Sequence, residues 1–157
     1  MIAEQELDKG ISILKVIWTA LAVSLVMYVA VIPLFLRDSP IDFPAEAYPD
    51  LRMFMYGLAF ATVVLSWFVR RLLLAAKLQA KPRQSRQHPV LQRYTTAMIV
   101  ALAMSEAIGI YGLILYLLGK NQTDLYLLTA LSAAAMTLYF PRKEEVSSLA
   151  IRLDRNV

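Results

Sequence analysis

The chain has 157 residues, of which 59% are hydrophobic, and it carries a net charge of +4 and no cysteine. Its mean hydropathy of +0.55 is too high for an ordinary soluble domain, and the missing cysteines exclude disulfides, thiolate metal sites and cysteine nucleophiles. The apolar residues gather in four blocks separated by short charged segments. We therefore predict an all-α integral membrane bundle of four transmembrane helices, which forms a single domain over residues 1–157.

The four apolar blocks give the expected positions of the spans. The first lies over about residues 13–36 and the second over about 52–76. The third lies over about 92–119 and is charged only at Glu106, and the fourth lies over about 124–141. The uncharged parts of the second and fourth blocks are near the lower limit of about 17 residues for a crossing helix. Flanking arginine and lysine side chains that reach toward the headgroups can lengthen both spans.

The distribution of charge predicts which side of the membrane each loop occupies. Basic residues crowd the predicted loop over 77–91 and its flanks, where no acid lies, whereas the loop between the first two spans carries four acids. By the positive-inside rule, the 77–91 loop, the 142–157 segment and both termini are cytoplasmic. Residues 144–153 suit an amphipathic helix on that surface. Contacts with anionic lipids explain the positive charge without any nucleic acid, and the pattern is typical of a bacterial inner membrane.

Glu106 stands alone within an otherwise uncharged stretch over residues 94–119. A charged carboxylate at the centre of a bilayer costs about 2.5 kcal/mol or more, so such acids face the protein interior and often handle ions or protons. Ser105 and Tyr111 are the candidates in the same helix for an ion-binding site with Glu106. Two interpretations remain open: an ion-binding carboxylate, or a neutral acid that satisfies a polar contact between helices.

Small residues recur at four-residue spacing along the helix of Glu106. Residues spaced in this way lie on one helix face, where they allow the backbone of a neighbouring helix to approach closely. The fourth span offers small residues at the same spacing and hydroxyl donors at Thr129, Ser132 and Thr137. We predict a close helix contact at Ala97, Ala101, Gly109, Gly112, Ala130 and Ala134.

The run Arg-Gln-His-Pro-Val-Leu-Gln-Arg over residues 86–93, with the helix residues 105–113 that follow, resembles the c subunit (proteolipid) of rotary ATP synthases. That family has a polar cytoplasmic loop followed by a helix with a carboxylate ahead of an Ile-Tyr-Gly-Leu-like segment. The resemblance covers about residues 53–119 and implies that Glu106 is the proton- or sodium-binding carboxylate, supported by Tyr111. The family's first helix carries regularly spaced glycines, whereas the second span here has only Gly57 and two further spans flank the hairpin.

Catalytic motifs are missing from the sequence: we find no nucleophile–base pair, no metal cluster and no phosphate-binding glycine loop. We therefore expect neither an enzyme nor a cofactor. We predict a non-catalytic membrane subunit that packs within a larger membrane complex through its c-subunit-like hairpin. Its expected partners are membrane lipids and other membrane subunits or copies of itself. The alternative is a proteolipid that binds protons or sodium ions at Glu106 for ion translocation, as the resemblance implies.

Overall fold

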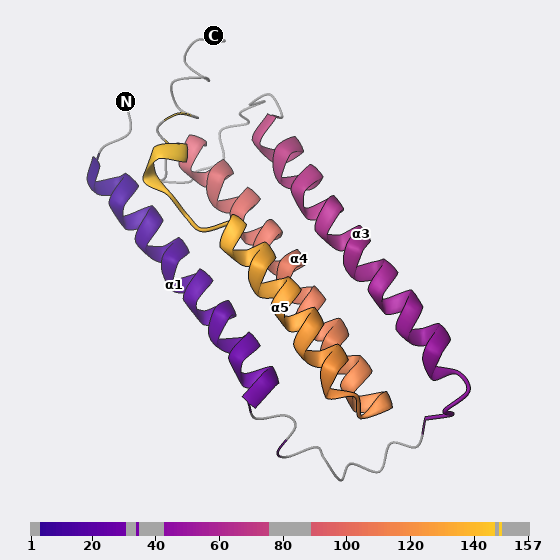
Figure 1. The fold of residues 1–157 in the computed structure, drawn as a ribbon. Helices are drawn as coiled ribbons and strands as arrows, with labels where there is room; N and C mark the ends of the chain where they lie inside the picture. Colours follow the sequence, from indigo (N-terminus) through magenta and orange to yellow (C-terminus); the bar gives the residue numbers. More distant parts are fainter. Residues whose placement is uncertain (1–3, 31–33, 35–42, 76–88, 147, 149–157) are drawn as a thin grey trace.

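The computed structural model describes residues 4–30, 34, 43–75, 89–146 and 148. Within these residues four long helices run side by side, α1 (Glu4–Ala30), α3 (Tyr48–Ala75), α4 (Pro89–Gly119) and α5 (Gln122–Leu138), and no strand occurs (Figure 1). α4 contacts the other three helices. α1 and α3 lie on opposite sides of the α4–α5 pair (Figure 1).

Three segments are long and apolar enough to cross a membrane: Leu7–Ala30 in α1, Tyr48–Ala75, and Val90–Gly119 in α4. Large apolar side chains such as Phe60 and Leu72 are exposed on α3, as expected for a helix that faces lipid. The all-α prediction and the membrane class are thus supported by three candidate spans. α5 has only 17 residues, so the fourth crossing stays a prediction.

The helices begin and end at residues that differ from the expected bounds. α1 begins at Glu4 and continues into the apolar segment without a break, so the residues before 13 form part of the same helix. α4 begins at Pro89 inside the predicted 77–91 loop, because proline fits the first turn of a helix, where its missing N–H is not needed. Residues 76–88 lie outside the described residues. Most of the predicted amphipathic helix over 144–153 also lies outside them, and its residues 144–146 are helical.

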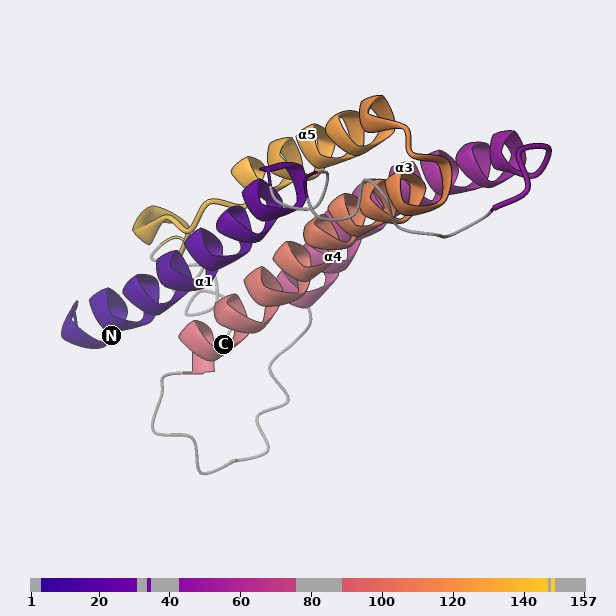
Figure 2. The same ribbon diagram turned by 90° about the horizontal axis from the view of Figure 1, so that it is seen from below.

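A two-residue connection joins α4 to α5. Lys120 adopts a left-handed φ of 52°, and its N–H donates to the carbonyl oxygen of Tyr116 at 2.8 Å. The side chain of Asn121 then caps α5 by accepting from the N–H of Thr123 at 3.0 Å. The connection turns the chain back on itself, and α5 runs antiparallel along α4 (Figure 2).

The buried apolar side chains form two clusters. One joins α1, α4, α5 and the residues after α5, and it includes Leu14, Leu102, Met136 and Val146. The other joins α3, α4 and α5 and consists of Ala59, Ile108, Leu115 and Leu128. α4 and α5 contribute to both clusters, and α4 makes the most extensive contacts with the other helices.

Candidate functional site

Glu106 lies in the middle part of α4, half-buried, and its hydrogen-bond partners come from α1. The hydroxyl of Ser24 lies 2.7 Å from Oε1 of Glu106, and the hydroxyl of Tyr28 donates to the same oxygen at 3.3 Å. Ser24 Oγ also lies 2.7 Å from the carbonyl oxygen of Leu21. Sequence reasoning did not find these partners, because the polar residues of α1 carry no signal that orients them toward α4.

Ser105 and Tyr111, the predicted companions of Glu106, point elsewhere. The hydroxyl of Ser105 is buried and donates to the carbonyl oxygen of Ala101 at 2.9 Å. Tyr111 packs against the second apolar cluster. At 3.6 residues per turn, Ser105 is rotated about 100° and Tyr111 about 140° around the helix from Glu106. Ion binding by these three residues together stays a prediction.

The small residues of α4 lie at the contacts with α1 and α5. Ala97 and Ala101 are buried. A Cβ atom at Gly109 would lie 2.6 Å from Leu25 Cδ2 of α1 and 3.5 Å from the hydroxyl oxygen of Ser132 in α5. The hydroxyl of Ser132 donates across the same contact to the carbonyl oxygen of Ser105 at 2.6 Å. The glycine thus lies where three helices meet.

On α5, the side that faces α4 is not the one expected from the alanine spacing. A Cβ atom at Gly112 of α4 would lie 2.9 Å from Leu128 Cβ and 3.3 Å from the carbonyl oxygen of Leu125. Ala130 and Ala134 are instead exposed. They are rotated away from α4 because α5 places its larger residues at the contact and fits them over the glycine.

A groove of about 610 Å³ runs between α1 and α5. Its walls are almost entirely apolar and contain alanines from both helices. The hydroxyl oxygen of Thr129, a lining residue, is buried and has no hydrogen-bond partner within the described residues. The residues that line the groove are Trp18, Ala22, Leu25, Val26, Val29, Ala30, Tyr126, Thr129, Ala130, Ala133, Met136 and Thr137.

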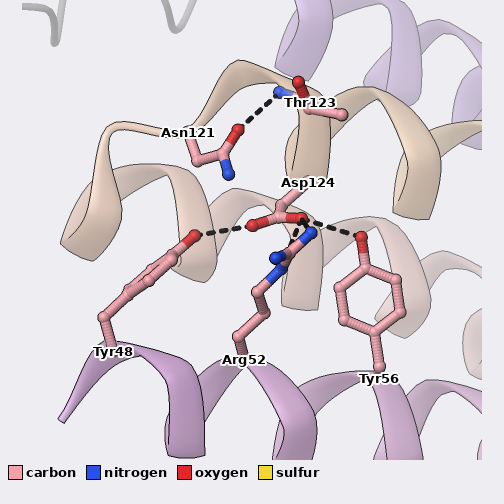
Figure 3. Close-up of polar contacts among 6 residues, drawn as sticks. All are labelled: Tyr48, Arg52, Tyr56, Asn121, Thr123 and Asp124. Carbon is pink, nitrogen blue, oxygen red and sulfur yellow. Dashed lines mark hydrogen bonds and ion pairs between the residues drawn. The ribbon is translucent and has the colours of Figure 1, made fainter. Parts of the chain in front are cut away.

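Asp124, in the first turn of α5, is fully buried and surrounded by donors from α3 (Figure 3). Its Oδ2 accepts from the hydroxyl of Tyr48 at 2.7 Å. Its Oδ1 accepts from Nε of Arg52 at 2.9 Å, from the second guanidinium nitrogen of Arg52 at 2.9 Å, and from the hydroxyl of Tyr56 at 2.9 Å. Both oxygens are occupied by protein donors, so this cluster anchors α5 to α3 and leaves no free ligand for an ion.

The sequence contains a signal for the Asp124 cluster. Tyr48, Arg52 and Tyr56 are spaced four residues apart, which places them on one face of a helix. Gly119, at the end of α4, makes the arrangement possible, because a side chain there would collide with the ring of Tyr48.

A second polar cluster lies at the opposite end of the bundle. Arg70 of α3 pairs with Glu145 at 2.7 Å, and the hydroxyl of Tyr94 donates to the same carboxylate at 2.9 Å. Nε of Arg93 donates to the carbonyl oxygen of Leu73 at 2.6 Å, near the end of α3. In neither cluster, nor elsewhere in the described part of the chain, do three His, Cys, Asp or Glu side chains come together to hold a metal ion.

Comparison with known protein families, with curated proteins and with solved structures finds no match to this chain. The resemblance to the c subunit therefore stays a proposal that rests on the residues quoted for it. Glu106, the α1–α5 groove and the two polar clusters are the features of the structure that bear on function.

Proposed function

We propose that this chain is a non-catalytic integral membrane subunit that packs against a transmembrane helix of a larger membrane complex. The groove between α1 and α5 carries this proposal. Its walls contain Ala22 and Ala30 on α1 and Ala130 and Ala133 on α5. In membranes, small residues let helix backbones approach closely, and hydroxyl groups such as that of Thr129 form hydrogen bonds across helices.

The dimensions and chemistry of the groove favour a helix over a lipid chain. The α1 wall extends from Trp18 to Ala30 and the α5 wall from Tyr126 to Thr137. At 1.5 Å per residue each wall is about 17 Å long, which corresponds to roughly three turns of a helix. Both walls contain alanines, which let the backbone of a partner helix approach closely, whereas a lipid acyl chain does not need small residues.

The same proposal includes four membrane crossings with both termini in the cytoplasm. α5 runs antiparallel along α4, and its length equals the lower limit of about 17 residues for a crossing helix. Arg142 and Lys143 follow it closely, and the backbone N–H of Arg142 lies 3.4 Å from the hydroxyl oxygen of Tyr94, near the start of α4. Tags added after Val157 should be accessible only from the cytoplasmic side, and labelling from the outside would contradict this topology.

In this proposal Glu106 is a buried hydrogen-bonding acid within a c-subunit-like hairpin that serves as a packing module. The single hydroxyl proton of Ser24 cannot serve both oxygens that lie 2.7 Å from it. A neutral Glu106 resolves this conflict, because it can donate to Ser24 while Ser24 donates to the carbonyl oxygen of Leu21. The resulting chain of hydrogen bonds ties α4 to α1.

Proton or sodium binding at Glu106 is the second candidate function. It is favoured by the hydrogen bonds recorded for the carboxyl group, all of which involve Oε1, so that Oε2 is available to bind an ion or exchange a proton. Labelling by dicyclohexylcarbodiimide, which modifies protonated carboxyls in membranes, tests this function. Protection of Glu106 by sodium would favour ion translocation, whereas labelling that is insensitive to sodium would leave a proton-binding or structural acid.

Cross-linking tests the proposed partner helix. Because the chain has no cysteine, Ala133→Cys provides a unique thiol in the groove to which a benzophenone group can be attached. Phe60→Cys is the matched control, because Phe60 is 71% exposed on α3 and does not line the groove. Illumination in native membranes should give one cross-linked product at Ala133 that maps to a transmembrane helix of another subunit, and only lipid adducts at Phe60.

Two results of this experiment would count against the proposal. Lipid adducts alone at both positions would show that the groove is filled by the bilayer. The same protein partner at both positions would show that the contact is not specific to the groove. A product of twice the chain mass at Ala133 would show that the partner is a second copy of this chain and not a different subunit.

A further inference from the structure

Arg93, near the start of α4, has a guanidinium group whose donors are only partly used. Its Nε is bonded to the carbonyl oxygen of Leu73. Its two terminal nitrogens are buried and have no hydrogen-bond partner within the described residues. Because each of these nitrogens carries two N–H groups, four donors of one charged side chain face no acceptor. Buried donors of this kind usually bind an ion or a water molecule.

No carboxylate pairs with Arg93 among the described residues. The ion pairs found among the described residues join other side chains: Arg52 with Asp124, Arg70 with Glu145, and Lys143 with Asp8. The sequence contains no aspartate or glutamate between Asp50 and Glu106, so the segment that joins α3 to α4 has no carboxylate to offer. Arg93 also lies close to the amino end of α4, where the helix dipole is positive and favours an anion.

We propose that Arg93 is the centre of a binding site for a phosphate group, and that the headgroup of an anionic phospholipid occupies it. A guanidinium group binds phosphate oxygens through two parallel N–H groups. Arg70 lies three residues before Leu73 on α3, and its Nε is buried and has no hydrogen-bond partner within the described residues. Basic sites between transmembrane helices at the cytoplasmic surface bind anionic headgroups.

The surrounding charges are compatible with an anion at this position. Glu145 is the acid of this cluster among the described residues, and it is already held by Arg70 and by the hydroxyl of Tyr94. Arg71 is exposed, and its guanidinium lies 5.4 Å from the centre of the Trp67 ring. The site is at the end of the bundle where α3 ends and α4 begins, away from the Asp124 cluster (Figure 1). It is independent of the α1–α5 groove, so either proposal can fail alone.

Native mass spectrometry of the detergent-solubilised protein, titrated with dioleoyl phosphatidylglycerol, tests the site. Arg93→Gln should weaken retention of the lipid by about tenfold or more, because charge-assisted hydrogen bonds are lost. Arg71→Gln is the matched control: it removes the same charge from an exposed side chain at the same end of α3, and it should change retention by less than about twofold. Equal loss in both variants, or full retention by Arg93→Gln, would overturn the proposal.

Two further measurements identify the ligand and guard against misfolding. Dioleoylglycerol, which lacks the phosphate, should bind independently of Arg93, and Arg93-dependent binding of this lipid would contradict a phosphate site. Inorganic phosphate that binds as tightly as the lipid would keep the anion site but refute the lipid as its source. Arg93→Lys keeps the charge without the two parallel donors and should show intermediate retention. Circular dichroism verifies that each variant is folded. If Arg93→Gln does not fold, the retention of lipid by Arg93→Lys decides the test.

Discussion

Replacement of Gly112 by alanine tests how closely α4 and α5 pack. The added Cβ would lie 2.9 Å from Leu128 Cβ, 3.3 Å from the carbonyl oxygen of Leu125 and 3.5 Å from that of Asp124. Two of these atoms are backbone carbonyl oxygens, and the third is a Cβ bonded directly to the backbone. α5 as a whole therefore has to move to accommodate the methyl group. Overpacking of this kind costs about 1–3 kcal/mol. The higher helix propensity of alanine offsets about 1 kcal/mol of that cost.

Gly57→Ala separates the two contributions. Gly57 lies inside α3, and a Cβ atom there would have nothing within 4 Å. The change should therefore stabilise the protein by up to about 1 kcal/mol through helix propensity alone. The difference in unfolding free energy between the two variants isolates the packing cost, for which we expect about 1–3 kcal/mol.

Unfolding of both variants in mixed micelles with increasing dodecyl sulfate, followed by circular dichroism, measures this difference. The expected order of stability is Gly57→Ala, then wild type, then Gly112→Ala. If Gly112→Ala proves as stable as Gly57→Ala, α4 and α5 are not as close as the structure places them, and the reasoning from this contact is wrong.

Three further substitutions test the polar contacts by the same unfolding assay. Asp124→Asn should lower the unfolding midpoint because Arg52 loses its charged partner. Asp50→Asn, which changes an exposed acid in the first turn of α3, should have little effect. Equal effects of the two variants would refute the Asp124 anchor. Glu106→Gln should change stability by less than about 1 kcal/mol, because the amide NH2 can still donate to Ser24. The same variant should abolish carbodiimide labelling, and a label that persists would lie on another residue. Trp18→Phe should cost about 1 kcal/mol because the indole N–H bond to α5 is lost, and an unchanged midpoint would show that this bond does not hold α1.

The helices could be predicted from the sequence because a backbone inside a membrane has to satisfy its own hydrogen bonds, so long apolar runs become helices. Their ends were harder to predict. α1 extends from Glu4, nine residues before the first span expected from about residue 13, because the helix continues without a break into that span. The position of Pro89 at the start of α4 could have been predicted from the preference of proline for the first helical turn.

The candidate site could be predicted only in part. Glu106 is recognisable because it is an isolated acid in an apolar helix. Its partners on α1 could not be assigned, because Ser24 is 82 residues away in the sequence and Tyr28 is 78 residues away. Which face of α1 meets α4 depends on packing that no local pattern determines. Ser105 is adjacent to Glu106 in sequence, yet helix geometry turns it toward α5.

The anchor between α3 and α5 has a consequence for the order of synthesis. Arg52 and Asp124 are 72 residues apart, and ribosomes add about 5–20 residues per second. The charged end of α3 is therefore made roughly 4–14 s before its partner on α5 exists. During that interval Arg52 and its two tyrosines have no carboxylate to bind, so an incomplete chain presents an unpaired arginine at a membrane helix end.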